Sequence, residues 1–154
     1  MKILLPIDGS QPALEAVRHA LRLLEDGLQA SFVLVNVQEP PSLYEVVLAH
    51  DVDVIDQVRG AAGADLLHPA EALLDAAGVD YESEVAGGDP SNLLVELLEN
   101  YGCQAVLMGA RGMGEPDARG LGSVAHALLN HSPVPVTVVR WQPEDEASDD
   151  ADAH

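Results

Sequence analysis

Short apolar runs alternate along the chain with longer segments in which apolar residues recur at helical spacing. Residues 3–7 and 31–37 are almost continuously apolar, which is typical of strands covered on both faces of a sheet. Between them, a helix is predicted to begin after the capping residue Ser10 and to end near Gly27, because leucine and valine recur there every three or four residues. A strand–helix–strand unit of this kind favours parallel pairing of its strands.

The middle of the chain is less regular. Residues 39–60 follow no clean period after two prolines, so this stretch is interpreted as a loop or lid followed by helix. Residues 61–77 have a helical pattern that Gly63 and Pro69 are expected to weaken or kink. Residues 79–85 alternate acidic with mostly apolar side chains, which predicts a strand with one solvated face at an edge of the sheet.

The last third of the sequence predicts two helices and two strands. Asp89 and Pro90 provide a cap and a first-turn proline for a helix that Gly102 ends. Pro135 has no N–H to donate to a strand ladder, so the last strand is expected at a sheet edge. The segments after Gly102 are a buried strand, a glycine-rich loop, a helix and a last strand, at residues 104–108, 109–122, 123–131 and 134–140.

Five strands joined by helical crossovers predict an α/β fold. We expect a single doubly wound, Rossmann-like domain at residues 1–140, with a five-stranded parallel sheet in the order 3-2-1-4-5 and helices on both faces. Residues 141–154 are expected to form an acidic, disordered tail. The single cysteine, Cys103, cannot form an internal disulfide, and no apolar run reaches the roughly 18 residues that span a bilayer. With no signal-peptide core after Met1, a cytoplasmic location is expected.

Acidic residues dominate the charge. The chain of 154 residues has 7 Lys and Arg against 26 Asp and Glu, a formal net charge of −19. A surface of this sign repels nucleic-acid phosphates and anionic lipids, which argues against nucleic-acid and membrane partners. Lys2 is the only lysine, and an acidic, lysine-poor surface suggests a halophile-like protein kept soluble at high salt, where screening removes the cost of self-repulsion.

Two loops are expected to meet at one crevice of this fold. In open parallel sheets, ligands bind beyond the carboxyl ends of the strands, where the strand order reverses. If strands 1 and 4 flank that point, the loops at residues 8–10 and 109–112 face each other. Glycines let a backbone approach a phosphate, and Gly122 and Ser123 open a helix whose N–H groups and hydroxyl can meet an anion. The pattern therefore favours a phosphate-containing ligand.

The spacing of the glycines is more specific than their number. Two residues separate Gly109 from Gly112, and nine more separate Gly112 from the pair Gly122 and Ser123. This Gly-x2-Gly-x9-Gly-Ser arrangement resembles the nucleotide-binding signature of the universal stress protein family. The resemblance covers residues 1–140 and includes the opening Ile-Leu-Leu-Pro-Ile-Asp-Gly-Ser, the Gly-Asp-Pro before a helix and the closing Ser-Pro-Val-Pro-Val.

The resemblance implies an ATP-binding stress-response protein of the cytoplasm that works as a homodimer and regulates a partner that the sequence does not identify. In such proteins the last strand, here from Val134 to Val139, pairs across the dimer. Mg²⁺ usually accompanies the triphosphate, and the sequence contains no visible set of side chains to hold it. The implied contacts with the adenosine and the phosphates are Pro6, Ile7, Asp8, Val37, Met108, Gly109, Arg111, Gly112, Gly122, Ser123 and Val124.

Other roles stay open at this point. Asp8 in a tight turn is often only a capping residue, Ser123 can cap its helix without excluding phosphate contact, and Arg111 can simply solvate its loop. Glu115 and Asp117 place negative charge near a bound triphosphate, so one alternative is a scaffold dimer that binds no nucleotide. A slow ATPase is the second alternative, although no catalytic motif occurs and no lysine accompanies the loops. Spacing alone also leaves AMP and cyclic nucleotides open.

Overall fold

Five parallel strands form one sheet in the order β3-β2-β1-β4-β5, as the sequence predicts. The structure is a computed structural model that describes residues 1–38, 52–110 and 122–141. The strands of the described part are β1 Lys2–Pro6, β2 Ser31–Gln38, β3 Tyr81–Gly87, β4 Ala105–Gly109 and β5 Val136–Val139. The helices of the described part are α1 Gln11–Glu25, α3 Val52–Ala76, α4 Pro90–Tyr101 and α5 Ser123–His131.

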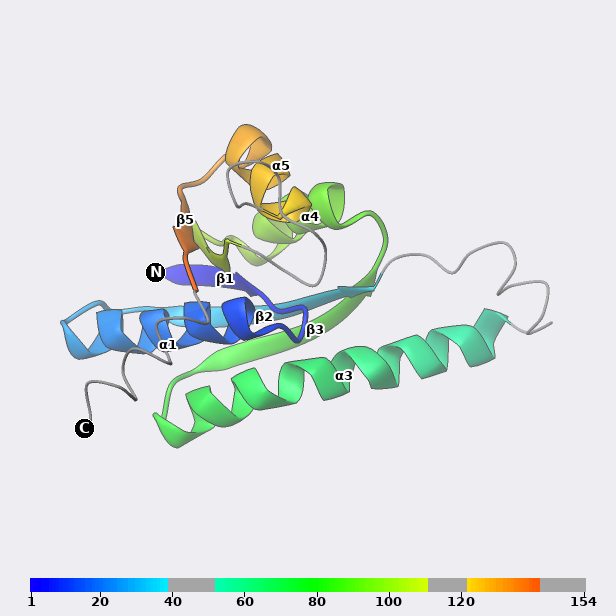
Figure 1. Cartoon of the computed structure of the whole chain (residues 1–154), viewed down its shortest axis with the longest axis horizontal. Coiled ribbons are helices and arrows are strands. Elements are labelled where there is room, and N and C mark those ends of the chain that lie inside the picture. Colours follow the sequence, from blue (N-terminus) through cyan, green and yellow to red (C-terminus); the bar gives the residue numbers. More distant parts are fainter. Residues whose placement is uncertain (39–51, 111–121, 142–154) are drawn as a thin grey trace.

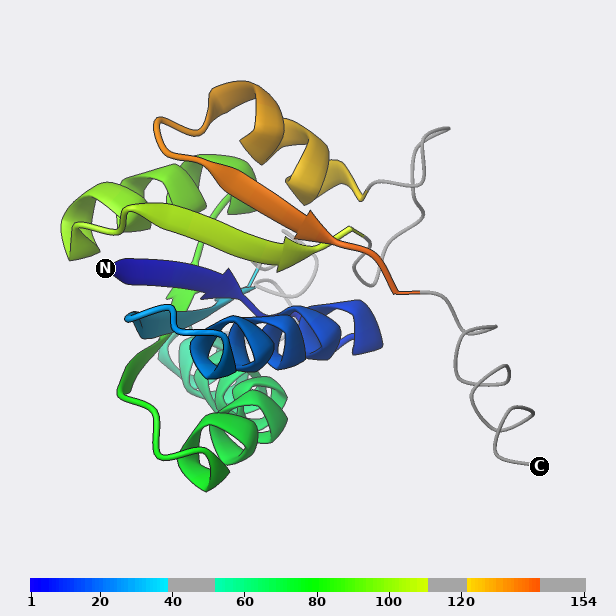
Figure 2. The ribbon, with the colours of Figure 1, turned by 90° about the vertical axis from the view of Figure 1, so that its left-hand side faces the viewer.

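The sheet separates two apolar layers. Helices α1 and α3 cover one face, and α4 and α5 cover the other, so the chain is doubly wound (Figures 1 and 2). Side chains of β1 and β2 alternate between the faces because successive residues of a strand point in opposite directions. The layer under α1 and α3 includes Ile3, Leu5, Phe32, Leu34 and Leu74. The layer under α4 and α5 includes Leu4, Val33, Val35, Leu94, Leu98 and Leu128.

Helix α3 joins the helix expected within residues 39–60 to the one predicted at residues 61–77. It runs from Val52 to Ala76 and contains Pro69, which was expected to weaken or kink it. A proline inside a helix costs about 3 kcal/mol. Leu67 and Leu74 are buried on either side of it, and burying a leucine contributes roughly 1.5–3 kcal/mol, so the core contacts of α3 offset the proline. The helix from residue 52 agrees with the helical end expected for residues 39–60, and the expected loop or lid at 39–51 lies outside the described residues.

Both predicted edge strands lie at edges of the sheet. β5 begins at Val136, later than predicted, and the residue before it, Pro135, accepts a hydrogen bond from Val106 N at 2.9 Å through its carbonyl. In β3 the predicted solvated face is only partly correct. Glu82 is exposed, whereas Glu84 is half-buried, and its Oε2 is buried without a hydrogen-bond partner in the described part of the chain.

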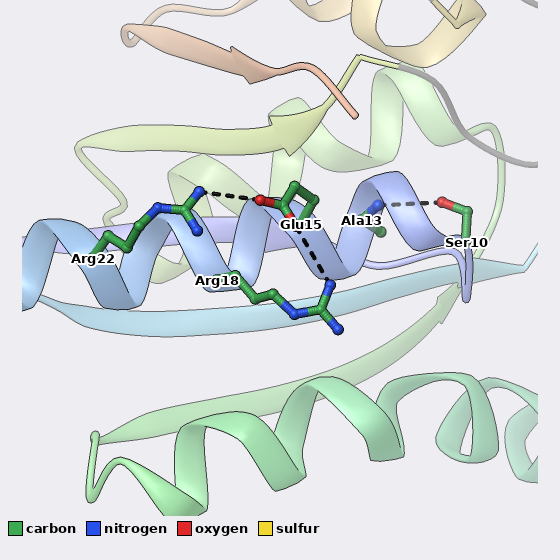
Figure 3. A network of polar contacts seen from close by, with 5 residues as sticks. All are labelled: Ser10, Ala13, Glu15, Arg18 and Arg22. Atoms are coloured by element: carbon green, nitrogen blue, oxygen red, sulfur yellow. Dashed lines mark hydrogen bonds and ion pairs between the residues drawn. The ribbon is translucent and has the colours of Figure 1, made fainter. Parts of the chain in front are cut away.

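The helix ends follow the sequence signals. Ser10 Oγ accepts from Ala13 N at 3.3 Å and caps α1, as predicted (Figure 3). Asp89 caps α4 in the same way, and Gly102 ends α4 in the left-handed conformation with φ 66°. On the exposed side of α1, Glu15 bonds to both Arg18 and Arg22 (Figure 3). Within the described ranges, no helix has the length and apolar character that crossing a membrane requires.

Candidate functional site

The strand order reverses between β1 and β4. These strands pair in the middle of the sheet, yet β1 leads to α1 on one face and β4 leads toward α5 on the other (Figure 2). Their connections therefore diverge at the carboxyl edge, which is where doubly wound folds bind ligands. The point at which the sequence predicts a ligand therefore lies at the carboxyl ends of β1 and β4.

The loop after β1 is held by several local contacts. Ile7 N donates to Val35 O at 2.8 Å, and Asp8 Oδ1 accepts from Ser10 N at 2.9 Å. Gly9 has φ +87°, a conformation that L side chains rarely adopt, and an ideal Cβ there would lie 2.5 Å from Cδ2 of Leu66 on α3. Asp8 therefore does serve as a capping residue of its turn, and this role uses one of its two carboxylate oxygens.

The start of α5 lies against the end of β4. Gly122 N donates to Ala110 O at 2.6 Å, and Ala110 N donates in turn to Val139 O at 2.9 Å. Gly122 is the N-cap of α5, so Ser123 is its first helical residue and not its cap. Ser123 is exposed, and within the described residues no side chain caps the N-terminus of α5. The first N–H groups of a helix have no partner within the helix, so this terminus can donate to an anion.

The remaining predicted contacts differ in what they can offer a ligand. The side chains of Ile7 and Met108 belong to the two core layers and are only 1% and 6% exposed, so these residues can meet a ligand mainly through the backbone. Pro6, Val37 and Val124 are half-buried. Two other predicted contacts, Arg111 and Gly112, lie outside the described residues, as do Glu115 and Asp117.

Gly109 has a structural role that the sequence does not reveal. An ideal Cβ on Gly109 would lie 2.6 Å from the carbonyl carbon of Pro12, in the first turn of α1. The missing side chain therefore lets α1 approach β4 closely. Packing against Pro12 alone is enough to explain glycine at this position. A role for Gly109 in admitting a phosphate therefore stays a prediction.

Sequence reasoning missed a polar group beside the β1 loop. Asn36 is buried in β2, and its Nδ2 donates to Ile7 O at 2.8 Å. Gln38 Nε2 donates to Asn36 Oδ1 at 2.6 Å. The sequence offers two signals of this buried amide. Asn36 interrupts an otherwise apolar run, and α3, which packs over it, has a glycine at position 63.

Among residues 1–38, 52–110 and 122–141, three basic side chains form ion pairs that lie away from the carboxyl edge. Lys2, the first residue of β1, lies at the amino ends of the strands and pairs with Glu82 at 3.9 Å. Arg18 and Arg22 pair with Glu15 along α1. Arg140 directly follows Val139, which pairs with Gly109, so Arg140 lies at the carboxyl edge and is a candidate that the sequence analysis did not name. In the described segments, no group of three or more His, Cys, Asp or Glu could hold a metal ion.

Several solved structures share this fold. The hypothetical protein MJ0577 gives a TM-score of 0.75 at 23% identity, over 92% of this chain and 96% of that one. A universal stress protein in complex with cAMP gives 0.63 at 23% identity, over 91% and 96%. At3g01520 of Arabidopsis thaliana, a universal stress protein family protein with AMP bound, gives 0.65 at 17% identity, over 98% and 99%. Identities of this size show the shared fold alone.

Relatives in sequence carry the same family name. Universal stress protein MJ0531 of Methanocaldococcus jannaschii is 27% identical over 139 residues, which are 90% of this chain and 81% of that protein. Universal stress protein YxiE of Bacillus subtilis is 28% identical over 146 residues, which cover 90% of this chain and 98% of that protein. The sequence model of the Universal stress protein family matches residues 1–140, so the chain belongs to this family.

Proposed function

We propose that this protein is an ATP-binding regulatory module that works as a homodimer. One observation carries the proposal: the 2.6 Å hydrogen bond from Gly122 N to Ala110 O holds the start of α5 against the end of β4. This contact puts the N–H groups of a helix N-terminus at the carboxyl edge of the sheet, next to the end of β4. A helix terminus in that position attracts an anion.

A nucleotide is the anion that fits the family. One universal stress protein structure contains cAMP and another contains AMP, which supports a nucleotide at the corresponding edge of this sheet. We extend the proposal to ATP because the glycine spacing from Gly109 to Ser123 resembles the family's nucleotide-binding signature. In this arrangement the adenosine would lie against Pro6 and Val37, and the phosphates would meet the N–H groups of Ser123 and Val124. Mg²⁺ would be held mainly by the phosphates and water.

We propose binding rather than turnover as the function. Phosphoryl transfer depends on positive charge placed at the γ-phosphate. The only lysine, Lys2, is the first residue of β1, so it lies at the amino ends of the strands, away from the carboxyl edge. There it pairs with Glu82. Bound nucleotide would therefore act as a signal that changes how the module meets its regulatory partner in the cytoplasm.

The proposed dimer uses β5. This strand is at an edge of the sheet and, together with the residues before it, presents half-buried valines at 134, 136, 138 and 139. An edge strand offers N–H and C=O groups to a second strand, which supports pairing between two copies through Val134 to Val139. Light scattering after size-exclusion chromatography, at low and at molar salt, tests this part separately. A monomer at all concentrations would contradict it.

The binding proposal has a direct test. The purified protein is denatured, and the supernatant is analysed for nucleotide by anion-exchange chromatography. Calorimetry with ATP, AMP and cAMP, each with and without Mg²⁺, then gives the affinities. We expect ATP with Mg²⁺ to bind most tightly. The proposal fails if no nucleotide is released and none of the three produces heat at either low or molar salt.

A variant at the helix start tests the location of the site. Gly122 has φ −71° and ψ 162°, an extended conformation that a β-branched residue adopts readily. Gly122→Val keeps this backbone conformation, but Gly122 is buried, so urea unfolding first checks that the variant folds. Its side chain would lie beside the first N–H groups of α5. We expect ATP affinity to fall at least about tenfold, since one blocked charge-assisted contact is worth about that much. Equal affinity in both proteins would place the ligand elsewhere.

A pair of arginine variants tests the electrostatics. Arg140 follows β5 at the carboxyl edge, whereas Arg22 pairs with Glu15 on α1, away from that edge. Arg140→Ala should weaken ATP binding more than it weakens binding of adenosine, which has no phosphates. Arg22→Ala removes the same charge from the protein and should leave ATP affinity within about twofold, as surface changes usually do. Equal losses in both variants would mean that only net charge matters.

A further inference from the structure

A buried pair of amides joins the loops at the carboxyl edge. Asn36 is 1% exposed, although every other residue from Phe32 to Val37 is apolar. Its Nδ2 donates to Ile7 O at 2.8 Å and its Oδ1 accepts from Gln38 Nε2 at 2.6 Å. Burying an amide is unfavourable unless its hydrogen bonds are made, and here both ends of the Asn36 amide are bonded.

The chemistry of the contact requires a donor at position 36. A backbone carbonyl can only accept, so the group of Asn36 that faces Ile7 O must be its NH₂. The register between β1 and β2 ends at the pair Pro6 and Val35, one residue before Ile7. The Asn36 amide therefore holds the first carbonyl beyond the paired part of β1.

The surrounding residues leave little freedom to the amide. An ideal Cβ on Gly63 of α3 would lie 2.8 Å from Asn36 Oδ1 and 2.5 Å from Cγ1 of Val85, so α3 packs directly on the amide. The amide pair thus links the ends of β1 and β2, and the backbone of Gln38 joins β3 to them, because Gln38 O accepts from Gly88 N at 3.0 Å.

We propose that Asn36 is a positioning residue of the nucleotide site, which fixes the Ile7 carbonyl and through it the place of Asp8 at the ligand. The inference rests on the proposed function and adds a residue that does not touch the ligand. Asp8 Oδ1 accepts from Ser10 N at 2.9 Å, so the side chain of Asp8 and the backbone of its loop keep one arrangement. A residue needed only for packing could as well be leucine, which has a similar shape and no amide to desolvate.

Two variants separate hydrogen bonding from packing. Asn36→Asp keeps the shape of asparagine, but its carboxyl can donate to Ile7 O only when it is protonated. Asn36→Leu cannot donate at any pH. Leu74→Ala is the matched control for lost stability, because Leu74 is fully buried in the same core layer and lies on α3 beyond the contact with Asn36.

The first measurement is ATP affinity by calorimetry at about pH 9 and about pH 5.5, because burial raises the pKa of a carboxyl by up to about 3–5 units from its usual value of about 4. At the higher pH we expect both Asn36 variants to bind about tenfold more weakly than the wild type, the usual effect of one lost buried hydrogen bond. At the lower pH Asn36→Asp should recover most of that loss, while Asn36→Leu should not. Leu74→Ala should bind like the wild type once corrected for its folded fraction.

Other charged groups lie near position 36, and their effect on the pH dependence of ATP affinity must be distinguished from that of residue 36. The loop carries Asp8, and α3 carries Arg59 and Asp65 within about a turn of Gly63. On β3 the residue opposite Asn36 is Val85, whereas Glu84 pairs with Val35 and lies on the other face of the sheet. The wild type has all of these groups, so the difference between its pH profile and that of Asn36→Asp reports position 36 alone.

A second measurement does not depend on nucleotide. Hydrogen exchange of the Ser10 amide, followed by NMR in the free protein, reports the order of the loop. Faster exchange in both Asn36 variants than in Leu74→Ala supports the positioning role, and equal exchange overturns it. Unchanged ATP affinity in both variants, or equal affinities of the two at low pH, also overturns it. If the wild type binds none of ATP, AMP and cAMP, the proposed function fails, and the exchange rates still decide whether Asn36 fixes the loop.

Discussion

Gly109 and Pro12 lie so close together that no side chain fits between them. An ideal Cβ on Gly109 would lie 2.6 Å from the carbonyl carbon of Pro12 and 2.7 Å from its oxygen. Gly109 ends β4, and Pro12 is in the first turn of α1. Backbone atoms cannot rotate away as the end of a flexible side chain can, so a methyl group here would have to move the helix or the strand.

Gly109→Ala should therefore destabilise the protein by about 1–3 kcal/mol, the usual cost of overpacking a core. The free energy of unfolding, measured in urea, is the test. Gly87→Ala is the control, because Gly87 also ends a strand, and its added Cβ would meet only Gln38 O at an ordinary 3.8 Å. We expect the control to change stability by less than about 0.5 kcal/mol. Equal stabilities of the two variants would mean that α1 moves at no cost.

Two glycines in α3 should respond in opposite directions to alanine. Nothing lies within 4 Å of an ideal Cβ at Gly60, so Gly60→Ala should stabilise the protein by roughly 0.5–1 kcal/mol through helix propensity. At Gly63 the same Cβ would meet Val85 and Asn36 at 2.5 and 2.8 Å. Gly63→Ala should therefore destabilise the protein by about 1–3 kcal/mol in spite of the same gain in propensity. Urea unfolding of both variants checks the prediction, and two changes of the same sign would contradict it.

Much of the fold could be predicted because local signals and burial agree. Strand order and edge positions follow from short apolar runs, helical crossovers and Pro135, and the caps at Ser10 and Asp89 are local features of the chain. Prediction was incomplete where tertiary contacts decide the outcome. Pro69 lies inside α3 between the buried Leu67 and Leu74, and one carboxylate oxygen of Glu84, on the predicted solvated face of β3, is buried.

The candidate site was only partly predictable for the same reason. Glycine spacing is a local pattern, so the start of α5 and the loop after β1 could be named from the sequence. The contacts that hold those loops join residues far apart in the chain: Asn36 with Ile7, Leu66 with Gly9, and Gly109 with Pro12. The spacing of apolar residues does not predict contacts between such distant residues. The sequence also cannot distinguish a glycine required for close packing from one required for phosphate binding.

Cys103 should react slowly in the native protein. It is 6% exposed and is the only cysteine of the chain. Burial raises the pKa of its thiol, which outweighs the opposite effect of the Lys2 ammonium, and thiolate is the reactive form. We expect its reaction with a disulfide reagent at neutral pH to be at least roughly tenfold slower than in urea-unfolded protein. Similar rates in both states would mean that the thiol is accessible in the folded protein.

Tyr81 should ionise only at strongly alkaline pH. Its hydroxyl donates to Asp75 Oδ1 at 2.8 Å, and this bond, with burial and the charges of Asp75 and Glu71, raises its pKa from 10.0 to about 12. Because the folded pKa lies above the unfolded one, the contact stabilises the protein below about pH 10 and loses this effect as pH rises through about 12. Asp75→Asn should return the Tyr81 transition toward 10, as followed by tyrosinate absorbance. Asp80→Asn, at an exposed position, should leave it unchanged, and an unshifted transition in Asp75→Asn would contradict the assignment.

Nucleotide affinity should rise as salt is first added, the reverse of what a basic site shows. The chain has a formal net charge of −19, so an anionic ligand is repelled by the protein around its site. The screening length falls from about 30 Å at 0.01 M salt to about 10 Å at 0.1 M, which removes repulsion from distant carboxylates but leaves contacts at the helix start largely intact. Calorimetry of ATP with a constant excess of Mg²⁺ across this range is the measurement. Adenosine, which carries no phosphate, is the control and should bind with an affinity that does not change. If ATP affinity instead falls steadily from the lowest salt upward, basic side chains rather than backbone N–H groups would dominate the recognition of the phosphates.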